Sequence, residues 1–436
     1  MRAARHPLGP ALALAAAIAG VGVGAPGGAR ADDKIDLTTT WFQENRRGGK
    51  GGLTVIHPQV DLGLDVGEHV LLDASYTADA VSGATAKVYS VDAVSSATTF
   101  SDLRHQGTLG LTFAGRRSRL GASASLGVER DYLSLTFAGN ASIDLPGKNT
   151  ALALSYSHGA DQVCDRANAE ATPFERRTLI GADPCKKNIL AGEDTYVMDR
   201  PELGTVTTWR DLTIDTAQAT VTQNLSPTSV LQLSLYGQVL DGMQSNPYRA
   251  VRIGPNEPQE HIPDTRARGA FTARLNRYIP ALRGAVHLQA RGYSDTWGVN
   301  AGTVELGYSQ YLGDALVFRL RGHVHQQTAA TFFKDAFYYQ TESSAGAYFT
   351  GDRELGAVRD VMIGGKLTMI SIAEDDHDLL GVFERLQLNL KADVMFLDEL
   401  AADDPANNPA GIDGQFLSAG QLVDAFTLQL GLQLDY

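Results

Sequence analysis

The last eleven residues of the chain alternate between apolar and polar side chains. One set of alternate positions is apolar and ends in an aromatic residue: Phe426, Leu428, Leu430, Leu432, Leu434 and Tyr436. Successive side chains of a β-strand point to opposite faces, so this segment predicts a strand with one apolar and one polar face. The pattern is typical of a transmembrane barrel strand, which is apolar toward lipid, polar toward the lumen and bounded by aromatic residues.

The same alternation recurs along the chain and is clearest from residue 386 to residue 396. Strands are expected at 35–45, 53–64, 68–78, 102–113, 118–129, 133–144, 149–158, 211–224, 229–239, 266–276, 283–293, 301–311, 315–326, 355–371, 383–397 and 424–436. This gives 16 strands, an even number, as bacterial single-chain barrels have. The sequence therefore predicts an all-β protein, a transmembrane antiparallel β-barrel of about 16 strands.

The lengths of the connections support this topology. With Tyr436 placed in the periplasm, short turns fall on that side at 65–67, 114–117, 145–148, 226–228, 278–282 and 312–314. The long connections 79–101, 159–210, 240–265, 327–354 and 398–423 then all fall on the extracellular side, as in outer-membrane barrels. The alternatives are a soluble β-sandwich, whose strands are shorter and number about seven, and a β-solenoid, whose fixed-period repeat is not found.

The N-terminus and the charge limit the location and the partners. Arg2 and Arg5 precede an apolar stretch and the small-x-small sequence of residues 29–31, which together predict a signal peptide at 1–31 and a mature barrel domain at 32–436. The net charge is −13, and it becomes 34 − 50 = −16 without the three arginines of the leader. Nucleic-acid binding requires basic faces, so nucleic acid is not an expected partner.

The two cysteines, Cys164 and Cys185, lie in one long polar segment of an exported chain. Disulfides persist in that compartment, so we expect a bridge that ties an extracellular loop. The alternative is a pair of free or metal-binding thiols, which the absence of a close ligand pair disfavours.

The first long loop contains a duplication. Its copies are 79–85 (DAVSGAT) and 92–98 (DAVSSAT), which differ only where Gly83 is replaced by Ser96. The first copy resembles the Asp-x-x-Ser/Thr-Gly-Ala-Thr/Ser acceptor motif of exported proteins that carry covalent FMN. The resemblance implies that Thr85 is the attachment residue, that Asp79, Ser82, Gly83 and Ala84 are read by an FAD-dependent flavin transferase, and that the second copy is a weaker acceptor site, with Asp92, Ser95 and Thr98.

This motif has other interpretations. Asp and Ser residues at these positions also form ordinary turns, or supply oxygen ligands for a cation such as calcium. The expected topology places the loop outside the cell, whereas flavin transferases of this kind are periplasmic. Modification would then have to precede insertion of the barrel, unless the loop folds down into the lumen.

Three neighbouring strands are expected to carry a basic inner face. Its arginines are Arg266, Arg268, Arg274, Arg291, Arg319 and Arg321, and they are joined by His287, His323 and His325. One interpretation is that this face makes part of the pore anion-selective or forms a binding site for a phosphate group. The other is that these charges pair with carboxylates such as Asp61 and Asp393 across the pore, because polar interiors are normal in such barrels. Two histidines on one face are a weak metal signal.

Several further segments resemble a bacterial outer-membrane family labelled domain of unknown function 3570. They are 241–253 (DGMQSNPYRAVRI), 274–280 (RLNRYIP), 292–307 (GYSDTWGVNAGTVELG), 129–132 (ERDY) and the duplicated loop. The family usually has His where this chain has Gly302, so a site that depended on that His would be missing here. The resemblance implies a barrel often encoded beside a flavin transferase and thioredoxin-like lipoproteins.

Three functional hypotheses follow. The first is a flavin-carrying component of envelope electron transfer, with FMN on Thr85 and with outer-membrane lipid, the barrel-assembly machinery, a flavin transferase and periplasmic redox proteins as partners. The second is a passive channel or porin-like transporter in which the basic face sets selectivity. The third is a structural or interaction barrel whose 159–210 loop meets a partner. No nucleophile elbow or His-Glu-x-x-His motif occurs, so the barrel is not expected to be an enzyme.

Overall fold

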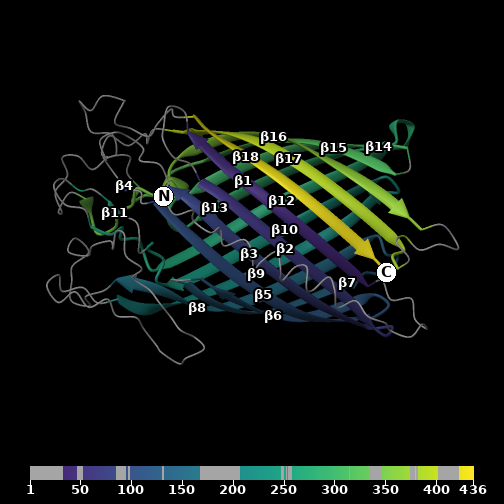
Figure 1. The fold of residues 1–436 in the computed structure, drawn as a ribbon, viewed down its shortest axis with the longest axis horizontal. Coiled ribbons are helices and arrows are strands. Elements are labelled where there is room, and N and C mark those ends of the chain that lie inside the picture. Colours follow the sequence, from purple (N-terminus) through teal and green to yellow (C-terminus); the bar gives the residue numbers. More distant parts are fainter. Residues whose placement is uncertain are drawn as a thin grey trace, which may run out of the picture.

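A computed structural model describes residues 33–46, 53–84, 95–96, 99–129, 132–166, 207–246, 250–251, 253, 258–313, 315–333, 345–373, 379, 382–400 and 422–436. These residues form one closed antiparallel barrel and a small two-stranded sheet beside one of its ends (Figure 1). The expected leader, 1–31, lies outside the described residues. No helix among the described residues is long and apolar enough to cross a membrane.

The barrel has sixteen strands, which confirms the number predicted from the alternation. They are β1 (Lys34–Arg46), β2 (Leu53–Val66), β3 (Val70–Ala84), β5 (Thr99–Ala114), β6 (Ser118–Val128), β7 (Tyr132–Asp144), β8 (Thr150–Arg166), β9 (Thr207–Ser226), β10 (Ser229–Gly242), β12 (Thr265–Ile279), β13 (Gly284–Asp295), β14 (Asn300–Leu312), β15 (Leu316–Gln327), β16 (Val358–Ile372), β17 (Arg385–Glu399) and β18 (Leu422–Asp435). The remaining strands, β4 (Ser95–Ser96) and β11 (Ala250–Val251), pair with each other.

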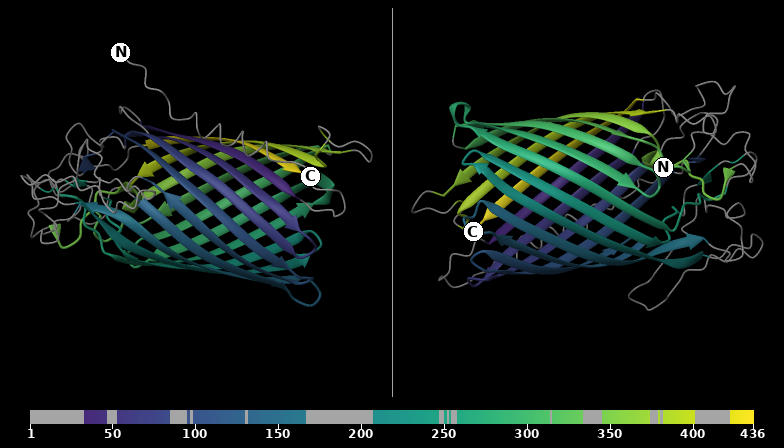
Figure 2. Two further views of the ribbon diagram at one scale, coloured as in Figure 1. Left: turned by 60° about the horizontal axis from the view of Figure 1, so that its bottom comes forward. Right: turned by 180° about the vertical axis from the view of Figure 1, so that it is seen from behind.

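The first and last strands close the ring. Strand β1 pairs with β18 along its whole length, from Lys34 opposite Asp435 to Arg46 opposite Val423. Each other barrel strand pairs with its neighbours in the chain, and the tilted strands wrap around one axis in all three views (Figures 1 and 2). Full closure leaves no sheet edge exposed, which is a requirement for strands that lie in lipid.

The outer surface is apolar at alternate positions, as the C-terminal strand predicts. Large side chains remain strongly exposed there, among them Leu109 at 69 %, Leu235 at 62 % and Leu430 at 57 %. Water would disfavour so much exposed apolar surface, whereas lipid accepts it. The inward positions of the same strands carry polar side chains such as Thr108, Gln429 and Gln433. The protein is therefore an integral outer-membrane β-barrel.

The two ends of the barrel differ in their connections. We call them the turn end, where the strands are joined mostly by a few residues, and the loop end, which carries the long connections. Tight turns at the turn end use left-handed backbone conformations at Gly67 (φ 74°), Gly147 (φ 91°) and Lys148 (φ 54°). Two loop-end connections, 129–131 and 296–299, are also short, and one turn-end connection, 373–384, is longer.

Several strands rise further toward the loop end than the alternation indicates. Strand β3 continues to Ala84 rather than ending at residue 78, and β8 continues to Arg166 rather than ending at residue 158. Strand β9 likewise begins at Thr207, four residues before its expected start. The expected loops 79–101 and 159–210 are correspondingly shorter, because beyond the membrane both faces of a strand meet water and the apolar alternation is no longer required.

Candidate functional site

The candidate site is the inner surface of β12, β13, β15, β16 and β17, which we call the basic wall. Its arginines occupy inward positions, because their neighbours in sequence point outward and are exposed, as are Phe271 at 48 %, Leu288 at 45 % and Leu320 at 49 %. The wall contains all six arginines expected on the inner face and two lysines that the sequence analysis did not single out: Arg266, Arg268, Arg274, Arg291, Arg319, Arg321, Lys366 and Lys391.

Two of the arginines are neutralised by aspartates of the same wall. Arg266 binds Asp295 of β13 through Nε at 2.9 Å and through Nη2, and its side chain is only 12 % exposed. Arg321 holds Asp393 with both Nε (3.1 Å) and Nη2 (2.8 Å). Paired donors of this kind fit a carboxylate closely.

The Arg321–Asp393 pair crosses an intervening strand. Arg321 of β15 is in register with Gly364 of β16, which is in register with Asp393 of β17. The pair therefore passes over Gly364, where there is no side chain to block it. Of the two aspartates expected to pair across the pore, Asp393 pairs within the wall, while Asp61 accepts a hydrogen bond from Gln59 at 2.6 Å.

The other four arginines have no carboxylate partner among the described residues. Arg274 donates twice to Gln289 Oε1, at 2.8 and 2.6 Å, and Arg319 donates to Ser309 Oγ at 3.0 Å. The guanidinium of Arg291 lies 6.0 Å from the ring centre of Tyr293. Nε of Arg268 is buried without a hydrogen-bond partner. The intervening strand β14 adds one inward carboxylate, Glu305, which the four arginines outnumber, so this part of the lumen is positive although the whole chain is acidic.

Three histidines lie in or beside the same wall. His287 contacts Asn276 Oδ1 at 2.7 Å and Ser309 Oγ at 3.0 Å, His325 contacts Thr303 Oγ1 at 2.8 Å, and His323 contacts Asp360 Oδ1 at 2.7 Å. Each ring is thus held by a separate neighbour. In the part of the chain that the structure describes, no cluster of three or more His, Cys, Asp or Glu side chains is placed to hold a metal ion.

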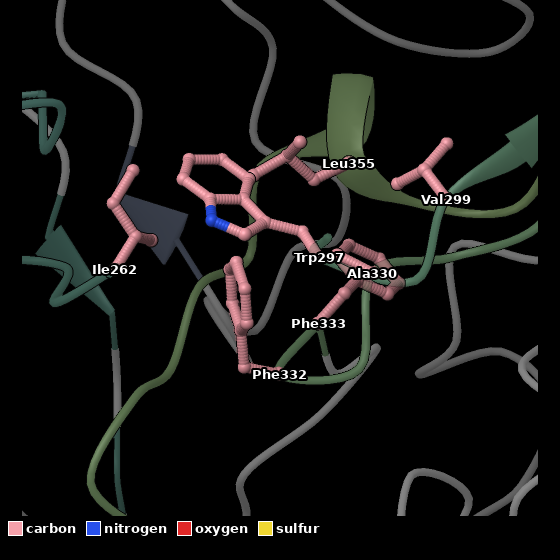
Figure 3. Close-up of a cluster of buried hydrophobic side chains, with 7 residues drawn as sticks. All are labelled: Ile262, Trp297, Val299, Ala330, Phe332, Phe333 and Leu355. Carbon is pink, nitrogen blue, oxygen red and sulfur yellow. The ribbon is translucent and has the colours of Figure 1, made fainter. Parts of the chain in front are cut away.

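A packed cap lies at the loop end beside the basic wall. Its larger apolar cluster comes from three connections, β10–β12, β13–β14 and β15–β16 (Figure 3). It comprises Ile262, Trp297, Val299, Ala330, Phe332, Phe333 and Leu355. Trp297 is central: its Nε1 donates to Thr265 O at 2.9 Å, and its ring meets Phe332 edge-on at 5.2 Å. The guanidinium of Arg266 lies 4.1 Å from the centre of the Trp297 ring, which links the cap to the wall.

A second part of the cap is held by a buried carboxylate. Glu260, only 3 % exposed, accepts the backbone N–H of Asn246 and the hydroxyl of Thr350, both at 2.7 Å. Beside it, the backbone groups of His261 and Phe349 exchange two hydrogen bonds. Phe349 packs with Val251, Ile253 and Ala345 in the smaller cluster. These contacts give the loops a core of their own.

The cap also takes in the duplicated loop. Strand β4, which contains Ser95 of the second copy, pairs with β11 in the connection between β10 and β12. Around the ring, β5, β6, β7, β8, β9 and β10 lie between the points where these two connections leave the barrel. Figure 1 draws β4 and β11 together at the loop end, so residues of these two distant connections pair there.

The first copy of the motif lies mostly in a barrel strand rather than in a loop. Asp79, Ser82, Gly83 and Ala84 all belong to β3, and Asp79 Oδ1 lies 2.6 Å from Nδ1 of His57 on β2. Thr85, the attachment residue implied by the FMN resemblance, directly follows the last residue of β3. Thr85, Asp92 and Thr98 lie outside the described residues.

The expected disulfide falls partly outside the described residues. Cys164 is fully buried near the loop end of β8, opposite Trp209 of β9. Its expected partner, Cys185, is not among the described residues, so the bridge stays a prediction.

Comparisons with known proteins agree with the architecture. A family model described as "Protein of unknown function (DUF3570)" matches residues 11–370. No curated protein matches the sequence significantly. Among solved structures, the chain is similar to a bacterial polysaccharide outer membrane secretin, with 8 % identity, a TM-score of 0.45, and coverage of 92 % of this chain and 98 % of that one.

Two further solved structures show the range of similar barrels. OccK11 (OpdR) of Pseudomonas aeruginosa has 9 % identity and a TM-score of 0.40, with 93 % of this chain and 96 % of that chain covered. CdiB from Acinetobacter baumannii has 10 % identity and a TM-score of 0.41, with 91 % and 60 % covered. At these values the similarities concern the general fold and indicate nothing about what the lumen binds.

Proposed function

The chain belongs to the family of proteins of unknown function DUF3570, and we propose that its barrel passes small anionic solutes along the basic wall, beneath a cap that restricts entry from outside. The observation that carries this proposal is the set of four arginines without carboxylate partners. Fixed charges that line a pore select permeating ions of the opposite sign. The proposed role requires no chemical turnover by the barrel itself.

The wall is suited to transient contact rather than to tight binding. Arg274, Arg291 and Arg319 are exposed to the lumen and hydrogen-bond only neutral groups or none among the described residues. An anion could therefore exchange part of its hydration for guanidinium contacts without first breaking an ion pair. Passage requires such contacts to be weak enough for release.

Reversal potentials across planar bilayers under a KCl gradient test this proposal. We expect the purified full-length barrel to prefer chloride, and the triple variant Arg274→Gln, Arg291→Gln, Arg319→Gln to lose that preference. The matched control is Arg277→Gln, because Arg277 lies on the same β12 strand but occupies an outward position near the turn end. A wild-type barrel that prefers cations, or a triple variant whose selectivity is unchanged, would contradict the proposal.

The second candidate function that we propose is carriage of covalent FMN on Thr85, and the resemblance of residues 79–85 to the covalent-FMN acceptor motif supports it. A transferase would form a phosphoester between FMN and the Thr85 hydroxyl, break the pyrophosphate bond of FAD and release AMP. Because Asp79, Ser82, Gly83 and Ala84 become part of β3, the enzyme would have to read them before the strand is inserted. Periplasmic transferases meet the chain at that stage, ahead of the barrel-assembly machinery, and periplasmic redox proteins would then be the partners of the flavin.

Peptide mass spectrometry of protein from its own host tests the second candidate. The peptide that contains Thr85 should gain the mass of FMN, and Thr85→Ala should abolish the gain. Thr98→Ala serves as the control for the second copy of the motif. An unmodified Thr85 peptide in cells that contain an active flavin transferase excludes this function and leaves the channel proposal unaffected.

A further inference from the structure

We propose that the outer surface of β5–β8 near the turn end binds one anionic glycerophospholipid, with an acyl chain in a shallow groove and its phosphate beside Arg116, Arg117 and Lys148. The strands involved are neighbours in the ring, and the two turns that join β5 to β6 and β7 to β8 lie at the same end (Figures 1 and 2). This site is separate from the lumen and does not depend on what the lumen passes.

The groove results from small residues between larger ones. On the outward rows of β6 and β7, Ala122, Gly139 and Ala141 replace the large side chains usual on a lipid face. Across the strands, Ala141 is in register with Leu120 of β6 and Leu154 of β8, which are 62 % and 59 % exposed. The hollow at Ala141 has a volume of about 550 Å³, within the usual range for ligand pockets, and its apolar lining is Phe113, Leu120, Ile143, Leu152 and Leu154.

The groove runs along the strands in the direction that an acyl chain takes. Its row nearest the turn end contains Ser118, Ile143 and Leu152, and the next row contains Phe113, Leu120, Ala141 and Leu154. Beyond these rows the small residues continue along the strands, with Ala122 and Gly139 between Leu111 and Tyr156. In the two rows farther from the turns, β5 and β8 supply large side chains and β7 supplies a floor of small residues, while Ile143 of β7 bounds the groove at its turn end. A methylene chain laid on the floor gains contact on three sides rather than one.

Positive charge gathers where the headgroup of such a lipid would lie. Arg116 and Arg117 form the β5–β6 turn, and Lys148 lies in the β7–β8 turn. The backbone N–H of Asp144 donates to Arg117 O at 2.8 Å, which fixes the first turn against the end of β7. All three cationic side chains are exposed, and none of them forms an ion pair with any carboxylate that the structure describes.

This charge is not shared by every turn at the same end. The β2–β3 connection, for example, carries Glu68 and directly follows the end of β2, where Asp65 lies. In outer-membrane barrels the short turns face the periplasm. Long basic side chains there can lie along the apolar rim while their charged ends reach the phosphate level. A lipid with a net negative charge interacts more favourably with three cationic side chains than does a zwitterionic lipid, whose headgroup carries its own ammonium.

Native mass spectrometry of the full-length barrel tests the site with two probes, phosphatidylglycerol and phosphatidylcholine of identical acyl chains. We expect wild type to retain phosphatidylglycerol at least about tenfold better than phosphatidylcholine, since each basic residue near a membrane surface favours anionic lipid by about fivefold. The triple variant Arg116→Gln, Arg117→Gln, Lys148→Gln should lose the preference. Arg277→Gln with Arg283→Gln, at the β12–β13 turn, is the matched control and should keep it.

A groove variant separates the headgroup contacts from the acyl contacts. Ala141→Phe fills the floor with a side chain that lipid accepts, so it should lower retention of both lipids while the barrel keeps its heat-modifiable migration on gels. Equal retention of the two lipids by wild type would overturn the proposal. So would a loss of preference in the control variant as large as that in the triple variant.

Discussion

Replacing Gly364 with alanine tests how the basic wall is held together. The Arg321–Asp393 ion pair passes over Gly364, and a Cβ at that position would overlap Asp393 Oδ1 and lie 2.8 Å from its Cγ. The neighbouring Gly365 points to the lipid side, where a Cβ would have its nearest neighbour, Arg319 O, at an ordinary 3.7 Å. Gly365→Ala is therefore a matched control, with the same change of residue one position further along β16.

The expected cost follows from the contacts that Asp393 would lose. Asp393 is only 7 % exposed and is bound by both Arg321 donors and by Lys391 Nζ at 3.2 Å. A hydrogen bond to a charged group contributes about 1.5–3 kcal/mol. Since Lys391 can follow the displaced carboxylate and Arg321 is partly solvated, we expect Gly364→Ala to lower the free energy of unfolding by about 2–4 kcal/mol. Gly365→Ala should change it by less than about 1 kcal/mol, in either direction.

Urea unfolding of the two variants in detergent micelles, followed by tryptophan fluorescence, measures the difference. The bilayer recordings described above provide a second readout, because Arg321 becomes available to permeating anions while Asp393 stays with Lys391, which should strengthen the preference for chloride. Equal stability of Gly364→Ala and Gly365→Ala would refute the inferred course of the ion pair. A destabilised Gly364→Ala barrel with unchanged selectivity would show that Arg321 does not face the permeation path.

Three other perturbations probe the cap, a turn and the screening of the lumen. Trp297→Ala should cost the cap about 3–5 kcal/mol of local stability, seen as faster loop proteolysis and larger conductance. Gly242→Ala should destabilise the barrel by about 2 kcal/mol or more in thermal unfolding, because Gly242 has φ +121° and its Cβ would overlap Asp211 O. Raising KCl from 0.01 to 1 M shortens the Debye length from about 30 Å to about 3 Å, so anion selectivity should fall steeply in reversal-potential measurements.

The strands and their number follow from the sequence because a membrane strand must satisfy lipid on one face and water on the other. Apolar and polar residues therefore alternate along each membrane-spanning strand, most clearly in β17 and β18. The alternation is required only in the part of a strand that lies in lipid. The upper part of β3 is rich in small and polar residues, so nothing in the sequence marks its continuation to Ala84, and the motif there resembles a loop.

The cap could not be predicted from the sequence. Its central residues, Trp297, Phe332 and Phe349, come from two connections that are separate in sequence, and no period links them. They become a core only when the connections above separate strand pairs meet. The β4–β11 pairing could not be predicted from the sequence either, because strands of two residues show no alternation of apolar and polar side chains.

In five of the six arginines of the wall, pairing follows burial, and Arg268, whose Nε is buried without a hydrogen-bond partner, is the exception. The two neutralised arginines, Arg266 and Arg321, have side chains only 12 % and 29 % exposed, so an unpaired charge there would be costly. Arg274, Arg291 and Arg319 are exposed and can rely on lumen water. Alternation predicts that all of these residues face inward, but only the three-dimensional arrangement shows which of them form ion pairs with aspartates of the wall. The remaining charges are those whose hydration an anionic solute would replace, and for this reason the channel proposal depends on them and not on the whole basic row.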